Sequence, residues 1–202
     1  GSVTAVTNSN KFEITTLRQD TKTDGRHADV LFTNNWQEDS ERRDFTINAI
    51  YMDVRGKIFD PQNGREDLKN NKVNFIGNPS VRIEEDYLRI IRYLRFCVQY
   101  GIIHSDPKTI NAIKLNLSGI KNLSKERILN ELYKIYNLKN INILLVNEEI
   151  KKIFLLIFPE FKYLKRLKKY TFYQNPELIF SVLLIDEKDN HEYFCHKYKV
   201  SN

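Results

Sequence analysis

Two short polar segments of this chain carry residue types that can bind a nucleoside triphosphate. The first is RRDFTINAI at residues 42–50, and the second is EDYLR at residues 85–89. Paired arginines suit triphosphate oxygens, because a guanidinium can form two parallel hydrogen bonds to phosphate, and carboxylate and carboxamide groups can bind ribose hydroxyls. A surface ion-pair network is the alternative interpretation. The first segment predicts a triphosphate and ribose site formed by Arg42, Arg43, Asp44 and Asn48.

The second segment has a donor and acceptor pattern that can read the edge of a base. An ionised Asp86 only accepts hydrogen bonds, and Arg89 only donates them. Such a pair accepts from an exocyclic amine and donates to the ring nitrogen beside it, which suits cytosine and adenine and not uracil or guanine. The alternative is a helix-surface ion pair of Asp86 or Glu85 with Arg89, worth only about 0.3–0.5 kcal/mol.

The chain changes from a strand-like front to a helical remainder at Asn78-Pro79. Before it, strands are expected at 3–6, 12–17, 28–33 and 58–60, a turn at 23–26, and either a strand or a buried helix at 45–52. After it, an apolar stripe at Tyr87, Ile90, Ile91, Leu94 and Val98 predicts a helix that also carries Asp86 and Arg89. Further helices are expected at 107–117, 124–137, 147–157, 160–170 and 176–185.

These elements predict an α+β fold, with a β-containing front of about 78 residues followed by an all-helical remainder. The longest apolar run is too short to span a membrane, no signal peptide is visible, and Cys97 and Cys195 have no metal-binding spacing. We therefore expect a cytoplasmic protein without a membrane partner, a disulfide framework or a zinc site.

The positive charge of the chain lies in its second half. Residues 1–100 hold 15 Lys and Arg against 15 Asp and Glu, whereas residues 101–202 hold 17 against 11, which accounts for the net charge of +6. A basic half suits a polyanion such as RNA, although an AT-rich genome also enriches lysine. The segment FKYLKRLKKY at 161–170 is the best candidate for RNA contacts, and a solvated face of an amphipathic helix is its alternative. The predicted RNA-binding residues are Lys162, Lys165, Arg166, Lys168 and Lys169.

Taken together, these motifs resemble those of the class II tRNA nucleotidyltransferases, the family of CCA-adding enzymes and bacterial poly(A) polymerases. The resemblance runs from Gly1 to Leu132. GSVTAV at 1–6 is similar to the family's G-T-V-T-V strand, residues 42–49 match its ribose motif, and EDYLR matches its E-D-x-x-R template. DPQNGREDL at 60–68 is similar to its D-P-x-G-G-x-x-D-L hinge, and residues 124–127 with 131–132 are similar to its neck motif.

The resemblance implies that residues 1–78 form a partial head, residues 79–140 a helical neck, and residues 141–202 a partial helical body. It also implies functions for further residues. Arg92 becomes an additional nucleotide contact, and Asp60, Asn63, Gly64 and Asp67 become hinge residues. Asn63 stands where the family has glycine, and asparagine tolerates the left-handed conformation best after glycine. Family members add C, C and A to tRNA 3′ ends, or A tails, using ATP and CTP with Mg²⁺ held by a D-x-D pair on a strand upstream of G-T-V-T-V.

That D-x-D segment is expected before Gly1, and Glu13 is the nearest strand carboxylate. Glu13 is a possible auxiliary carboxylate, or it forms a salt bridge with Arg18 or Arg26. We therefore expect no metal ligands here and a tRNA-binding, base-selecting part of a nucleotidyltransferase. A second chain docked at an exposed strand edge near 3–6 would supply catalysis. A poly(A) polymerase part, a non-catalytic remnant and a basic RNA-binding module remain alternatives.

Overall fold

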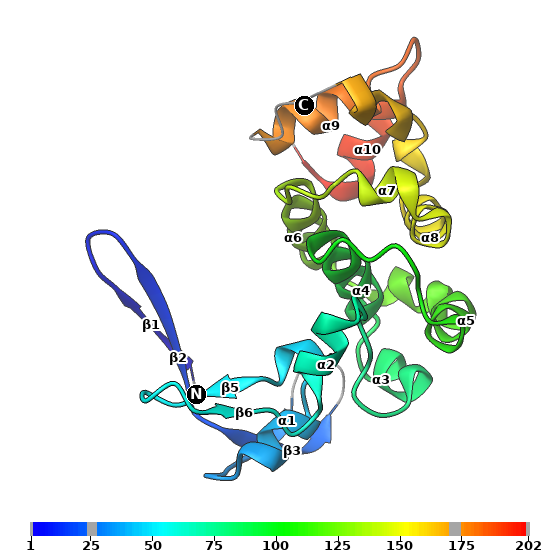
Figure 1. The fold of residues 1–202 in the computed structure, drawn as a ribbon. Helices are drawn as coiled ribbons and strands as arrows, with labels where there is room; N and C mark the ends of the chain where they lie inside the picture. The colour runs from blue at the N-terminus through cyan, green and yellow to red at the C-terminus, as the bar shows by residue number, and fades with distance from the viewer. Residues whose placement is uncertain (1, 24–27, 170–174, 201–202) are drawn as a thin grey trace.

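The computed structural model describes residues 2–23, 28–169 and 175–200. Figure 1 shows a β-containing head at one end and helices stacked away from it toward the C-terminus. The α+β class expected from the sequence is confirmed. The expected boundaries at 78 and 140 stay a prediction, and one continuous core of buried side chains extends across both of them, from Phe45 to Tyr198.

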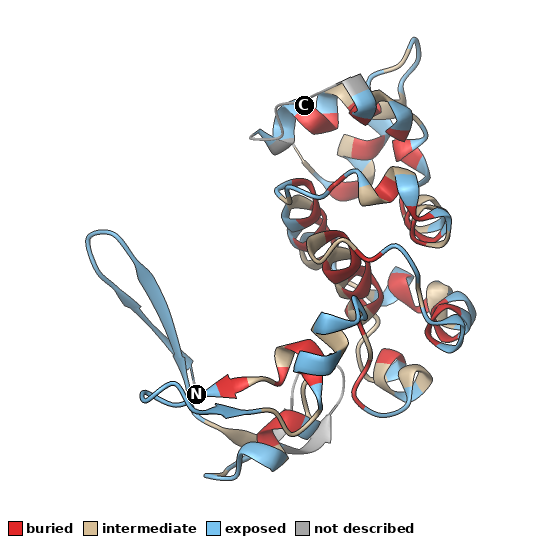
Figure 2. Cartoon of the chain, in the orientation of Figure 1, coloured by how far each residue is buried: buried red, intermediate tan, exposed pale blue. Residues whose placement is uncertain are grey.

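Three antiparallel hairpins make up the strands of the head. β1 (Ser2–Val6) pairs with β2 (Lys11–Thr15), β3 (Arg18–Thr23) with β4 (Ala28–Phe32), and β5 (Tyr51–Met52) with β6 (Ile58–Phe59). The strands expected near these positions are therefore confirmed, whereas the turn expected at 23–26 falls mostly outside the described residues. The β1–β2 hairpin projects from the head with all its residues exposed (Figure 2). Its register sets Val3 opposite Ile14 and Ala5 opposite Phe12, so one of its faces is apolar.

Residues 45–52 form neither the continuous strand nor the buried helix expected from their pattern. Phe45 makes a single antiparallel bridge to Phe75, a 3-10 turn follows at η1 (Thr46–Asn48), and only Tyr51–Met52 is a strand. The Thr46 N–H donates to the Asn74 carbonyl, and the Thr46 hydroxyl donates to Asp67 at 2.6 Å. These tertiary hydrogen bonds replace a regular ladder and fix the segment against 67–76.

Five of the helices follow the apolar periodicity closely: α4 (Leu88–Gln99), α5 (Pro107–Asn116), α6 (Lys125–Tyr136), α8 (Glu148–Ile157) and α9 (Pro176–Leu184). Five were not expected: α1 (Trp36–Glu41), α2 (Gly64–Lys69), α3 (Pro79–Glu85), α7 (Ile143–Val146) and α10 (Asn190–Tyr198). The helix expected at 160–170 is wrong, because this stretch forms the 3-10 turns η3 (Pro159–Phe161) and η4 (Leu164–Lys169); η2 (Leu117–Asn122) links α5 to α6.

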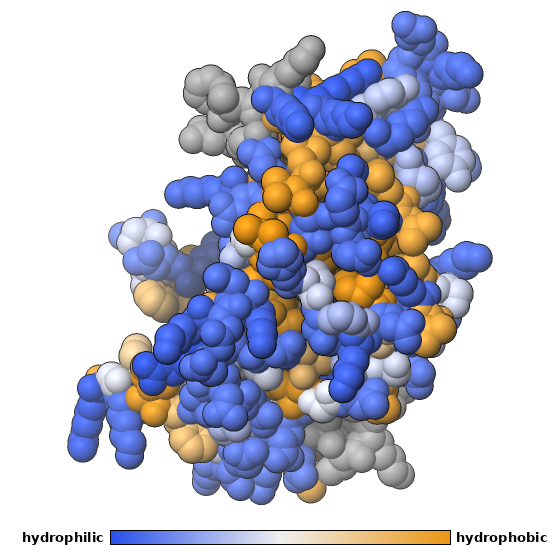
Figure 3. All heavy atoms as spheres, turned by 45° about the vertical axis from the view of Figure 1, so that its right-hand side comes forward, coloured by the Kyte–Doolittle hydropathy of each residue, from blue (hydrophilic) through white to orange (hydrophobic). Residues whose placement is uncertain are grey.

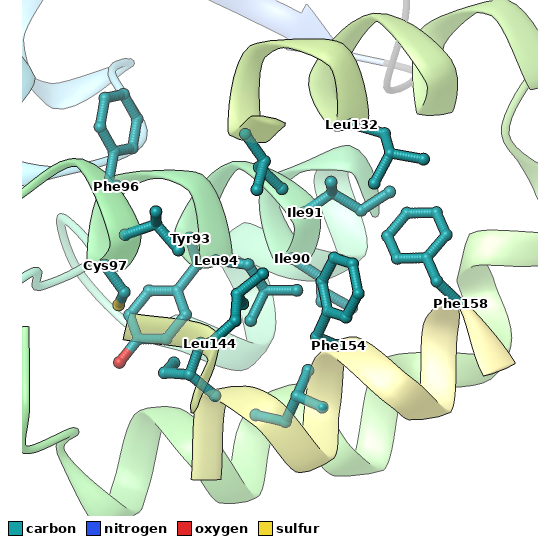
Figure 4. Close-up of a cluster of buried hydrophobic side chains, with 14 of the residues drawn as sticks. Ile90, Ile91, Tyr93, Leu94, Phe96, Cys97, Leu132, Leu144, Phe154 and Phe158 are labelled. Atoms are coloured by element: carbon teal, nitrogen blue, oxygen red, sulfur yellow. The ribbon is translucent and has the colours of Figure 1, made fainter. Parts of the chain in front are cut away.

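Helix α4 lies at the centre of the helical part. Its expected stripe is confirmed at Ile90, Ile91, Leu94 and Val98, which are fully buried, while Tyr87 is half-buried just before the helix begins. Figure 4 shows Ile90, Ile91 and Leu94 of this stripe among Leu132 of α6, Leu144 of α7 and Phe154 of α8. Because α4 touches all three helices, its opposite face is held in a fixed direction. That face carries Arg89 and Arg92.

The face drawn in Figure 3 is mostly hydrophilic, with hydrophobic side chains in patches among the hydrophilic ones. In the part of the chain that the structure describes, no helix is long and apolar enough to cross a membrane.

The loop that resembles the family's hinge is anchored by its two aspartates. Asn63 adopts the left-handed conformation with φ of 57°, as the sequence predicts for a residue that replaces glycine. Asp60 accepts hydrogen bonds from the main-chain N–H groups of Gly64 and Arg65 at 2.8 and 2.9 Å. Asp67 accepts from Thr46 and Asn74, so both ends of the loop are tied down. A hinge motion of these residues stays a prediction.

Replacing Gly64 with Ala is expected to lower the free energy of unfolding by about 1–3 kcal/mol, the usual range for an overpacked site. A Cβ at Gly64 would overlap the carbonyl of Thr46, a main-chain group that cannot rotate away. Urea unfolding would measure the change. Lys69→Ala, at an exposed position of the same helix, is the control and should change stability little. Equal stabilities of wild type and G64A would contradict the packing of α2 on η1.

Candidate functional site

A polar cleft of about 540 Å³ lies between the head and helix α4. It is lined by Arg18, Arg42, Arg43, Asp44, Asn48, Asp86, Arg89, Arg92 and Phe96. The structure thus brings together all seven residues that the sequence predicts as nucleotide contacts, from segments about forty residues apart. Five arginines against two aspartates give the cleft a positive lining, which favours an anionic ligand.

Arg42 and Arg43 are both held by Asp39, a fully buried carboxylate in the first turn of α1. Arg42 contacts one carboxylate oxygen at 2.6 Å, and Arg43 contacts the other at 2.9 Å. The Tyr51 hydroxyl also donates to Asp39, at 2.8 Å. Burial alone would raise the pKa of Asp39, but the hydrogen bonds from Tyr51, Arg42 and Arg43 outweigh it and lower this pKa to about 2. Asp39 therefore stays charged and fixes two neighbouring guanidiniums in spite of their mutual repulsion.

Asp44 links the head to helix α4. One of its oxygens accepts from the Asn48 side chain at 2.9 Å, and the other accepts from Arg92 Nε at 2.6 Å. Burial raises the pKa of the Asp44 carboxyl, but the charge and hydrogen bond of Arg92 bring it below its ordinary value. The carboxylate is therefore ionised and orients both Asn48 and Arg92 at the cleft wall.

The expectation that Asp86 and Arg89 lie on one helix is wrong. Helix α3 ends at Glu85 and α4 begins at Leu88, while Asp86 between them is extended, with φ of −156° and ψ of 105°. The Asp86 side chain accepts from the Leu88 N–H at 3.1 Å, the preference of aspartate for helix starts. Asp86 therefore sits in a helix-to-helix corner that the unbroken apolar stripe does not reveal.

Asp86 and Arg89 also have separate partners. Arg89 pairs with Glu85 at 2.6 Å, which is the second of the two ion pairs considered from the sequence. Asp86 pairs with Arg127 of α6 at 2.7 Å. Ser124 caps that helix, as expected, by accepting from the Arg127 N–H. Asp86, the hydrogen-bond acceptor, and Arg89, the donor, thus both line the cleft without being bound to each other.

A second buried carboxylate, Glu131 on α6, forms ion pairs with arginines of α4. It is 3% exposed and accepts from Arg95 at 2.7 Å and Lys134 at 2.8 Å, with Arg92 at 3.9 Å. Burial raises the pKa of Glu131, but Lys134 and Arg95 lower it below the ordinary value. This arrangement agrees with the support that the neck motif implies.

Sequence reasoning missed Asp39, Tyr51, Arg82 and Arg127 as partners of the cleft residues. Asp39 stands three and four residues before Arg42 and Arg43, a helical spacing that could have indicated it. Its helix α1 is short and polar, so no apolar period marks it. The other three are paired through tertiary contacts, which local spacing does not show.

Two of the cations in the basic segment at 161–170 already bond to residues 182–186 of the same chain. Lys162 pairs with Asp186 at 2.9 Å. Arg166 donates to the carbonyls of Val182 and Ile185 and lies over the Tyr163 ring, with its guanidinium carbon 4.1 Å from the ring centre. Lys165 and Lys168 are exposed, and the side chain of Lys169 lies outside the described residues. RNA binding by this segment stays a prediction.

The described residues do not fit a magnesium site. Within them, no three His, Cys, Asp or Glu side chains are grouped closely enough to hold a metal ion. Glu13 lies on the exposed hairpin opposite Thr4 and is not among the residues that line the cleft. Arg26, one of the partners expected for Glu13, falls outside the described residues.

Replacing Asp39 with Asn is expected to lower the free energy of unfolding at neutral pH by about 2 kcal/mol, from the shift of its pKa below the ordinary 3.8. Because the folded-state pKa is the lower one, this stabilisation is complete above about pH 4 and is lost as the pH falls through about 2. The difference between wild type and D39N should shrink over that window in urea unfolding. Glu41→Gln, on the exposed face of α1, should show no such trend; a D39N difference that is constant down to pH 2 would contradict the role of Asp39.

Comparisons with known proteins place the chain in a family. A model described as the poly A polymerase head domain matches residues 1–74. Human "CCA tRNA nucleotidyltransferase 1, mitochondrial" is 53% identical over 140 residues, which are 67% of this chain and 32% of that protein. The "CCA-adding enzyme" of Staphylococcus saprophyticus is 40% identical over 139 residues, 68% of this chain and 35% of that enzyme. The chain thus spans about a third of the length of these relatives.

Solved structures agree with the sequence relatives. The Bacillus stearothermophilus CCA-adding enzyme in complex with CTP is similar with a TM-score of 0.68 and 28% identity, covering 100% of this chain and 51% of that one. A tRNA-processing enzyme with CTP has a TM-score of 0.71 at 21% identity and shares the fold. By sequence and by fold, the chain belongs to the family of class II tRNA nucleotidyltransferases and bacterial poly(A) polymerases.

Proposed function

We propose that this chain is the nucleotide-binding and base-selecting part of an enzyme that adds C and A to tRNA 3′ ends. The observation that carries the proposal is the single cleft on which both predicted segments converge. Relatives named CCA-adding enzymes, one of them solved with CTP, support the same substrate class. The proposed substrates are therefore ATP, CTP and tRNA.

The cleft divides into two regions that suit the two ends of a nucleotide. The guanidiniums of Arg42 and Arg43 bind the triphosphate, because Asp39 holds them side by side without neutralising both charges. Asp44 and Asn48 bind the ribose hydroxyls, and Arg92 beside them contacts the nucleotide. The region that binds the triphosphate and the ribose does not distinguish one base from another, since all ribonucleoside triphosphates share these two parts.

Base selection is the task of Asp86 and Arg89. Each carboxylate oxygen has two acceptor sites, so Asp86 can accept from the exocyclic amine of C or A while it keeps its bond to Arg127. Among the described contacts, Arg89 uses only Nη1, which leaves its other donors for the ring nitrogen of the base. Uracil and guanine instead place a ring N–H opposite Arg89, which only donates, and a carbonyl oxygen opposite Asp86, which only accepts.

Transfer needs a group that the described residues do not form. The family's Mg²⁺ ions require closely spaced carboxylates, and we propose that these come from another segment or a second chain. Lys165 and Lys168, which are exposed, are the proposed contacts to tRNA phosphates. A cytoplasmic location stays a prediction.

Asp86→Ala is expected to weaken the binding of ATP and CTP by about tenfold or more, the effect of losing a charge-assisted hydrogen bond. Binding of UTP and GTP should change little, because they do not use this acceptor. Calorimetric titration with all four nucleotides measures both effects, and circular dichroism checks folding. Glu84→Ala removes a neighbouring exposed carboxylate and is the control. Unchanged ATP and CTP affinities in a folded D86A protein would favour an RNA-binding module without base reading.

Incubation of the chain alone with labelled CTP or ATP, Mg²⁺ and a tRNA lacking its CCA end is expected to give no incorporation, because the described residues hold no cluster of metal ligands. Saturable ATP and CTP binding should persist in the same samples. Incorporation above background would contradict the division of tasks, and Glu13→Gln would then show whether the hairpin carboxylate is responsible. Continued addition of A alone would instead identify a poly(A) polymerase.

A further inference from the structure

Arg82 on α3 bridges the head and the corner that carries the base-reading residues. Its Nη2 donates to the main-chain carbonyls of Arg42 and Arg43, at 2.8 and 2.6 Å. Its Nη1 donates to Glu85 at 2.6 Å. One planar guanidinium therefore bonds two segments that are about forty residues apart, a task for which its fixed fork of donors is suited.

The bonds continue from Arg82 to Arg89. The same oxygen of Glu85 that accepts from Arg82 also accepts from Arg89 Nη1, at 2.6 Å. Arg89 Nη1 donates in addition to the main-chain carbonyl of Arg82, at 2.7 Å. An unbroken path of hydrogen bonds thus runs from the backbone of Arg42 and Arg43 to the side chain of Arg89.

The position of Arg82 is costly for stability. Its side chain is 13% exposed, its Nε is buried and finds no hydrogen-bond partner, and it lies close to another cation. Burial and the charge of Arg89 lower the pKa of Arg82. A buried ion pair is often no more stabilising than apolar packing, so stability alone does not account for an arginine here.

Arg82 is not among the residues that line the cleft, so it acts on a nucleotide through others. Arg42 and Arg43 keep their side chains oriented through Asp39 without it. What Arg82 fixes is the placement of their backbone relative to the corner at Asp86. We propose that Arg82 is a positioning residue that sets the separation between the triphosphate-binding and base-reading parts of the cleft, and so determines selectivity for C and A over U and G. This inference rests on the proposed function.

Hydrogen exchange tests the bridge without any nucleotide. Arg82 joins a head segment, which contains Arg43 and Asn48, to the corner segment, which contains Asp86 and Arg89. In wild type, the main-chain N–H groups of these four residues all donate to main-chain carbonyls within their own segment. Arg82→Lys keeps the charge but replaces the planar fork with a single ammonium group. Exchange in both segments should become about tenfold faster in R82K, the effect of losing a charge-assisted hydrogen bond.

Nucleotide titration then tests selectivity. In R82K, ATP and CTP should bind about tenfold more weakly, whereas UTP and GTP should be unchanged within about twofold. Tripolyphosphate, which reports on the arginines alone, should also stay within about twofold. Equal losses for tripolyphosphate and all nucleotides would mean that Arg82 is merely structural and would overturn the proposal.

Lys197→Ala is the matched control. Lys197 lies in α10, and its Nζ contacts the buried carboxylate of Glu160 at 2.6 Å, so this variant also removes a cation from a buried ion pair. It should lower the melting temperature and leave selectivity and exchange near Arg82 unchanged. Wild-type exchange rates in R82K would refute the bridge, and intact selectivity with faster exchange would refute the role of Arg82 in selectivity. A wild-type protein that does not discriminate among nucleotides would instead refute the proposed function, and exchange alone would then decide whether Arg82 is a bridge.

Discussion

The repulsion among the guanidiniums of the cleft is the constraint on which the arrangement of this protein depends. Five arginines line one cavity, and in isolation their charges would drive the segments apart. The structure sets carboxylates behind them, with Asp39 for the head arginines, Asp44 and Glu131 for Arg92, and Glu85 for Arg89. Each carboxylate contacts more than one polar partner, so the cations are fixed in direction before any ligand arrives. Preorganised donors lose less entropy when an anion binds.

These carboxylates come from separate elements, so the cleft exists only in the packed protein. Asp39 belongs to α1, Glu85 to α3 and Glu131 to α6, while Arg92 belongs to α4 between them. Helix α4 therefore has two tasks on opposite faces. One face is buried against α6, α7 and α8 (Figure 4). The other carries the arginines. Loosening the core would change the direction of the arginines as well as the stability of the fold.

The sequence predicted this arrangement where a local pattern reports the structure. The stripe of α4, the Ser124 cap and the left-handed Asn63 each follow from residue types at fixed spacing. The pattern failed where tertiary bonds override it. At 45–52 the backbone pairs with 74–76, and at 160–170 the buried Leu164 and Leu167 are three residues apart, which a 3-10 turn satisfies as well as an α-helix does.

The residues of the cleft were identified by type, but their partners were not. Spacing along the chain shows that Asp86 and Arg89 are near each other. It cannot show that Arg127, which is 41 residues from Asp86, and Arg82, which is 7 residues from Arg89, form hydrogen bonds with them. The helix break at Asp86 also could not be predicted from the sequence, because apolar positions on both sides of it continue the helical period.

The separation of Asp86 from Arg89 has a consequence for recognition. A direct ion pair between them would satisfy both groups, and a base would have to break it before it could be read. Here Arg127 holds Asp86 and Glu85 holds Arg89, so each is oriented by a third residue while neither is bound to the other. In the proposed function, a base that inserted at this corner would gain hydrogen bonds to both side chains and leave both ion pairs intact. Two carboxylate–guanidinium pairs side by side can therefore serve as a rigid template where one direct pair could not.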